Sequence, residues 1–165
     1  MKPRPRRAVS LAVAWSFTFA ALSCAAAMAT LAGLPLGAEM FGRAIADRAQ
    51  ERDAGLAAIL WLSGDLKAGC GLVALALLPA GGRPLRGVVA ATWCIGAGLT
   101  AYGAYNVIAA GLMLAGAVAT PDEVGTTAVR WHIALWGPWW LAGGALFLLA
   151  AAGQRPGPVR RRPST

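Results

Sequence analysis

Two charged residues, Asp65 and Lys67, lie in the middle of the apolar segment WLSGDLKAGCG. A charge at the centre of a bilayer costs about 2.5 to 3.5 kcal/mol on insertion scales, so each residue is expected to have a partner or a function. At a separation of two positions on an α-helix, the two side chains point about 200° from one another. They therefore do not face the same groove, and each is expected to find a partner of its own.

Other polar side chains fall at similar depths on neighbouring apolar segments. Counting outward from the short connection at 81–86 places Asp65 level with Thr100, and it places Lys67 near Ser23. We therefore predict an intramembrane polar cluster that consists of Ser63, Asp65, Lys67, Thr100, Tyr102 and Asn106. The cluster has two interpretations: a proton or ion relay or polar substrate pocket, and a hydrogen-bond network that fixes the register of the helices.

A second group of chemically capable residues is aromatic. The segment 130–152 holds Trp131, Trp136, Trp139 and Trp140, and it also holds the only histidine, His132. On a helix, one face would carry His132, Trp136 and Trp139, with Trp140 beside it. These four residues could line an outer aromatic pocket, opened by a kink at Pro138. We favour the alternative, an anchor belt at the outer membrane interface, where indole rings are enriched.

The residues needed for catalysis or cofactor binding do not occur in a recognisable pattern. A single histidine excludes bis-histidine haem ligation, and no cysteine spacing suits a metal. Cys24, Cys70 and Cys94 form no CxxC pair and are interpreted as small buried hydrophobes. We therefore predict no catalytic, cofactor-binding or metal site, and no enzymatic activity.

The composition indicates which structural elements hold these residues in place. The chain has 165 residues, of which 58% are hydrophobic and 13% charged, too apolar for a soluble protein of this size. Four apolar runs are each long enough to cross about 30 Å of hydrocarbon as a helix. They are 8–36, 54–80, 87–119 and 131–152. We predict an all-α, four-helix transmembrane bundle in a membrane domain at 8–152, between a basic flank at 1–7 and a disordered basic tail at 153–165.

The distribution of charge predicts the orientation. The flanks before the first span, between the second and third, and after the fourth contain basic residues and no acid. The other two loops contain six of the seven acidic residues. By the positive-inside rule both termini are cytoplasmic, and the chain is a multi-pass protein of the cytoplasmic membrane with the lipid bilayer as its surroundings. The net charge of +8 lies mostly in tails and loops, so we expect no nucleic-acid partner.

Two segments allow a second interpretation. The first span could be a cleaved signal peptide, but its apolar run is longer than a typical h-region, which favours a retained helix. The outer loop at 37–53 places Phe41, Ile45 and Arg48 on one stripe and could form a short helix on the membrane surface. We favour an ordinary solvated connector whose charges pair locally.

Three segments carry a resemblance to a known family. They are RWHIALWGPWWLAGGALFLLA, YGAYNVIAAGLMLAG and GDLKAGCGLVALAL, and they resemble small bacterial four-span membrane proteins described only as a domain of unknown function. The most specific part is the Trp-x-Pro-Trp step, where the family pattern has an aspartate and this chain has Gly137. The resemblance implies an uncleaved four-helix unit with Lys67 as a typical residue. The glycine argues against an acid-dependent role at the outer end of the fourth helix.

Two functions are consistent with these features. The first is a non-enzymatic membrane component that associates with other membrane proteins, with lipid or with itself. The alternative is a small transporter or channel subunit in which Asp65 and Lys67 pass a proton or polar solute.

Overall fold

Helices make up the regular secondary structure of the computed structural model, which describes residues 5–78 and 84–154. The helices that are long and apolar enough to span a membrane include α1 (Pro5–Ala32), α4 (Ala54–Leu75) and α5 (Arg86–Leu114). The fourth is one continuous segment composed of α6 (Gly125–Trp131), the π-helical turn η1 (His132–Trp136) and α7 (Gly137–Ala152). The predicted all-α fold with four membrane-spanning helices is confirmed.

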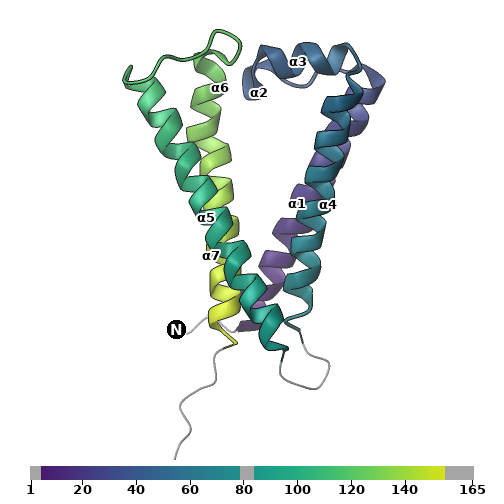
Figure 1. Ribbon diagram of the computed structural model, residues 1–165, viewed down its shortest axis with the longest axis vertical. Helices are drawn as coiled ribbons and strands as arrows, with labels where there is room; N and C mark the ends of the chain where they lie inside the picture. The colour runs from purple at the N-terminus through teal and green to yellow at the C-terminus, as the bar shows by residue number, and fades with distance from the viewer. Residues whose placement is uncertain (1–4, 79–83, 155–165) are drawn as a thin grey trace, which may run out of the picture.

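The four long helices form two pairs. Helix α1 packs along α4, and α5 packs along α7, with the α1–α7 contact joining the pairs. Figure 1 shows the pairs converging at the end where α1 begins and α7 ends, and diverging toward the end that carries α2 (Ala38–Phe41), α3 (Arg43–Gln50) and α6. The first and last described residues therefore lie at the same end of the bundle.

Glycines allow the helices within each pair to approach closely. A Cβ atom on Gly64 of α4 would lie 2.8 Å from Cys24 Sγ and 3.3 Å from the Ala20 carbonyl oxygen of α1. A Cβ on Gly96 of α5 would lie 2.9 Å from the Leu148 nitrogen of α7. Such backbone-to-backbone approach is the usual way in which helices gain packing energy in lipid, where no hydrophobic force drives them together.

Three helices end earlier than the apolar runs predict: α4 ends at Leu75, before residue 80, and α1 and α5 each end at a glycine. Helix α1 stops at Ala32 because Gly33, with φ of 71°, and Leu34 donate to the carbonyls of Thr30 and Ala29. The same pair of bonds, a Schellman motif, ends α5 at Leu114, before Gly116. The third span was expected to continue to residue 119, but the left-handed glycine closes the helix first.

The connector between the first two long helices is largely helical, unlike the ordinary loop that we favoured. Gly42, with φ of 92°, separates α2 from α3 and lets the Arg43 amide donate to the Glu123 carbonyl at 3.0 Å. This hydrogen bond ties the connector to the loop before α6. Phe41 reaches the Trp136 ring, with centroids 5.3 Å apart.

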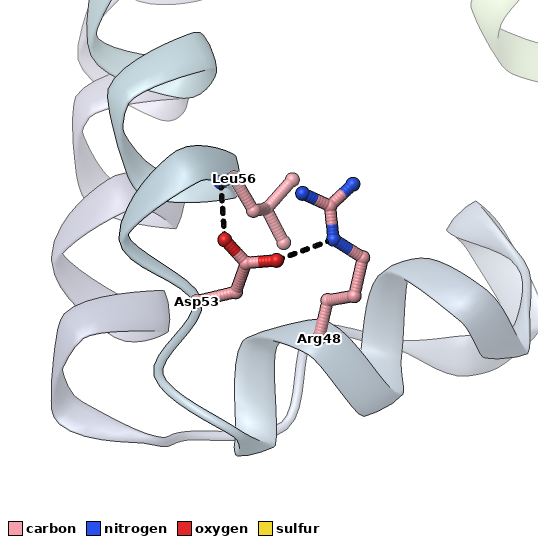
Figure 2. A network of polar contacts seen from close by, with 3 residues as sticks. All are labelled: Arg48, Asp53 and Leu56. Atoms are coloured by element: carbon pink, nitrogen blue, oxygen red, sulfur yellow. Dashed lines mark hydrogen bonds and ion pairs between the residues drawn. The ribbon is translucent and has the colours of Figure 1, made fainter.

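Asp53 caps the start of α4, as Figure 2 shows. Its carboxylate accepts the Leu56 amide at 3.0 Å and an Arg48 Nε–H at 2.6 Å. The hydrogen bond from Arg48 is the main reason why the pKa of Asp53 lies below its usual range, and the Leu56 amide adds to the effect. The same hydrogen bond raises the pKa of Arg48. The local charge pairing expected in the connector is present at this position.

Candidate functional site

Lys67 lies at the junction of three helices. Its ammonium donates to Ser23 Oγ of α1 at 2.6 Å and to Ser63 Oγ of α4 at 2.8 Å. The same nitrogen lies 4.0 Å from the centre of the Phe19 ring and 5.7 Å from that of Trp140. Hydroxyl acceptors and aromatic faces both stabilise a cation that has left water. We call these five residues the Lys67 cluster.

Three tryptophans of the fourth span, Trp136, Trp139 and Trp140, are partly buried against α1. Phe19 of α1 meets Trp140 edge to face, with centroids 4.8 Å apart, and Trp15 stacks on Trp139 at 6.1 Å. Gly143 makes room for Trp15, because a Cβ there would meet the indole ring. The structure therefore differs from the expected outer belt or pocket: Trp136, Trp139 and Trp140 all contact aromatic rings of α1.

The extra length of the fourth span explains this difference. Its helical segment begins at Gly125, whereas the apolar run begins at Trp131, so Trp139 and Trp140 lie near the middle of the span. The π-helical turn ends at Trp136, two residues before Pro138, and the Gly137 amide donates to the carbonyl of His132, five residues back. Proline cannot pair with the carbonyl four residues before it, and a π turn accommodates that loss.

His132 lies in η1, on the α6 side of this aromatic layer. Its Nδ1 is 2.9 Å from the Ala128 carbonyl oxygen of its own helix. Nδ1 is therefore bonded within its own helix, and His132 makes no hydrogen bond with the Lys67 cluster among the described residues. Within the described ranges, no three His, Cys, Asp or Glu side chains come together in a way that could hold a metal ion.

Asp65 is exposed on a different side of α4 from Lys67. It lies halfway along the 22 residues of this helix, between Ala54 and Leu75. In the part of the chain that the structure describes, no hydrogen bond or salt bridge joins Asp65 to any other residue. The two intramembrane charges therefore have opposite environments: Lys67 is paired within the chain and Asp65 is not.

The other members of the predicted polar cluster lie on α5 and bond within that helix. Thr100 Oγ1 donates to the Gly96 carbonyl at 2.8 Å, and Asn106 Nδ2 donates to the Tyr102 carbonyl at 2.8 Å. Tyr102 is half exposed and meets Trp140 edge to face at 5.0 Å. Of the predicted cluster, the structure brings together Ser63 and Lys67, while Asp65, Thr100 and Asn106 lie apart from them.

Trp15 and Phe19 are the members of the site that sequence analysis did not single out. Both are buried, with 8% and 6% of their surface exposed. Their spacing of four residues, which places two large rings on one face of α1, is the signal that could have identified them. Their rings connect Lys67 to the fourth span.

The interior around these rings is rich in hydrogen-bond donors. The indole nitrogens of Trp15, Trp136 and Trp139 are buried and have no hydrogen-bond partner among the described residues. Lys67 adds a cation, and the contacts described above include no carboxylate. This arrangement can bind hydrogen-bond acceptors, and it holds the hydroxyls of Ser23 and Ser63 within hydrogen-bond distance of the Lys67 amine.

Comparison of the chain with protein-family models, with curated proteins and with solved structures finds no match. The function is therefore inferred from the geometry of the two charged positions.

Proposed function

We propose that this chain is a non-enzymatic, multi-pass protein of the cell membrane, with both termini in the cytoplasm, and that it works by associating with another membrane protein. The observation that carries the proposal is the exposed position of Asp65 halfway along a helix that can cross the bilayer. A carboxylate facing hydrocarbon is costly, and a protein partner that covers it removes the cost.

The contrast with Lys67 supports this interpretation. The chain satisfies Lys67 with two hydroxyls and an aromatic ring from its own helices. It offers no such group to Asp65 within the described residues. If both charges were internal structural features, both would be expected to have internal partners. The lack of an internal partner for Asp65 among the described residues favours a partner outside the chain.

The arrangement is less favourable to the transport alternative. A relay through Asp65 and Lys67 needs the two groups to share a path, but Lys67 faces α1 and α7 while Asp65 is exposed on another side of α4. Measuring proton flux into vesicles that contain the parent or the Asp65→Asn, Lys67→Met double variant tests the alternative. Association predicts the same flux for both proteins and for empty vesicles.

The charges support the proposed orientation. Among the described residues, the end where α1 begins carries Arg6, Arg7 and Arg86, whereas all acidic residues except Asp65 lie toward the end with α2, α3 and α6. Single cysteines at Gln50 and Gln154, in a background without native cysteines, test the topology. A membrane-impermeant maleimide is expected to label the Gln50 position in intact cells, and the Gln154 position only after lysis. The reverse result would overturn the orientation.

Photocrosslinking in cells tests the association itself. A benzoylphenylalanine at Leu62, which is 71% exposed one turn from Asp65, is expected to give a discrete protein adduct. Ile108 on α5 is the matched control, because it is 62% exposed on a face without a charge. The adduct at Leu62 should disappear with Asp65→Asn. No adduct at Leu62, or equal adducts at both positions, would contradict the proposal.

A further inference from the structure

Asp65 is the centre of a regular stripe on α4, whose members are exposed apart from the partly buried Gly69. The stripe, which we call the Asp65 face, consists of Ala58, Leu62, Asp65, Gly69 and Leu72. Its alternating spacing of four and three residues is the 3.5-residue repeat of helices that pack along one another. Leu62 and Leu72 are 71% and 57% exposed, so the described elements leave the stripe largely uncovered on both sides of Asp65.

Gly69 gives the Asp65 face a depression next to the carboxylate. A Cβ atom on Gly69 would find nothing within 4 Å, unlike one on Gly64 or Gly71, where α1 lies against α4. The small residue one turn from Asp65, with larger leucines beyond, lets a neighbouring helix approach closely. An approaching side chain could then reach the carboxylate.

The charge decides what kind of helix fits. A carboxylate in hydrocarbon is best covered by a cation, because an unpaired charge of either sign is costly there. A second copy of this chain does not supply one. Lys67 is the cation that the described residues place at this depth, and it is already bonded to Ser23 and Ser63. A two-fold symmetric pair would also oppose Asp65 with Asp65.

We infer that the Asp65 face docks a transmembrane helix of a different protein, one that carries a lysine or arginine near the middle of the bilayer. This inference rests on the proposed function and specifies the partner. The carboxylate selects the partner by charge, and Gly69 selects it by allowing close approach.

A synthetic helix tests the selection directly. The full-length protein, with a fluorescent donor at its C-terminus, is reconstituted in phosphatidylcholine vesicles. The probe is a leucine-rich transmembrane peptide with one central arginine and an acceptor dye, and its matched control has leucine at that position. Energy transfer is expected to show about tenfold tighter association of the arginine peptide, the effect of one strong intramembrane polar contact. Asp65→Asn should abolish the preference.

Two glycine variants test the contribution of the shape of the Asp65 face separately from that of its charge. Gly69→Leu fills the depression on α4, and Gly98→Leu makes the same change on the exposed side of α5, where a Cβ also finds nothing within 4 Å. At neither position would an added Cβ atom contact another part of the described chain. Gly69→Leu is expected to weaken binding of the arginine peptide about fivefold or more, whereas Gly98→Leu should leave it unchanged.

Several results would overturn the inference. Equal binding of the arginine and leucine peptides, or a preference that survives Asp65→Asn, would refute recognition of a basic helix. Energy transfer between two labelled copies that depends on Asp65 would assign the face to a second copy. Association itself is judged separately by the adduct at Leu62 in cells. An adduct without arginine preference refutes only the basic partner, and absence of the adduct refutes the proposed function.

Discussion

Replacing Lys67 by methionine is expected to change the stability of the bundle little, although Lys67 bonds to side chains of two membrane-spanning helices. The substitution removes two hydrogen bonds and the contact with Phe19, but it also removes a charge from the apolar interior. Replacing Ser23 and Ser63 by alanine while keeping Lys67 is expected to be clearly destabilising. The charge then stays and its partners are lost.

The magnitudes follow from the contacts. Intramembrane hydrogen bonds contribute about 0.6 to 1.7 kcal/mol each, so the two hydroxyls together supply about 1 to 3 kcal/mol. An ammonium close to an aromatic face with little water adds about 2 kcal/mol. The cost of the charge is about 2.5 to 3.5 kcal/mol, which nearly cancels these gains. Because the gains sum to about 3 to 5 kcal/mol, Lys67→Met should shift stability by about 1 kcal/mol and by no more than about 2.5 kcal/mol, whereas the double serine variant should lose about 1 to 3 kcal/mol.

Unfolding by sodium dodecyl sulfate in mixed micelles measures these differences, with tryptophan fluorescence as the signal because Trp140 lies 5.7 Å from the ammonium. The triple variant, with Ser23 and Ser63 changed to alanine and Lys67 to methionine, is the decisive control. It should recover the stability that the double serine variant loses. If Lys67→Met alone is destabilising by more than about 3 kcal/mol, or if the triple variant is no more stable than the double, the balance derived above is wrong.

Two further predictions concern other positions. Gly137→Asp is expected to destabilise the bundle by about 1 to 3 kcal/mol, because its Cβ would meet Val107 Cγ2; Val107→Ala should restore part of the loss in the same unfolding assay. The cap of α4 should weaken at acid pH, because the pKa of Asp53 is lower in the folded protein than in the unfolded chain. Its contribution is complete above the unfolded pKa, near 4, and is lost as the pH falls through the lower folded value. The protection factor of the Leu56 amide, which is its exchange rate relative to that of an unfolded chain at the same pH, should therefore fall in this range in the parent and stay constant in Asp53→Asn.

Much of the fold follows from local rules that a sequence displays. Apolar runs long enough to cross a bilayer must be helical, since backbone groups in lipid have no water to bond. The helical period likewise separates Asp65 from Lys67, and depth matching places Lys67 near Ser23, where the hydrogen bond is 2.6 Å long. The early ends of α1 and α5 were also visible in principle, because Gly33 and Gly116 are the residues a Schellman motif requires.

The same rules did not predict where the tryptophans of the fourth span lie. An indole at the end of an apolar run suggests a membrane interface, but α6 and η1 lengthen the fourth span and carry Trp139 and Trp140 toward its middle. The packing of these tryptophans against α1 became clear only from the tertiary structure, which places Trp15 and Phe19 opposite them. Those contacts join residues more than a hundred positions apart, and no local pattern relates them.

By itself, then, the sequence determined that the chain is four apolar helices with two charges on different sides of one of them. Tertiary structure alone decided which charge is internal. In a soluble protein, polar faces mark the outside of each helix, but in a membrane the packed and the lipid-facing residues are both apolar. Hydrophobic periodicity therefore cannot show which side of α4 meets α1. Gly64 and Gly71 decide that by their fit against α1, and this fit leaves Lys67 bonded and Asp65 exposed.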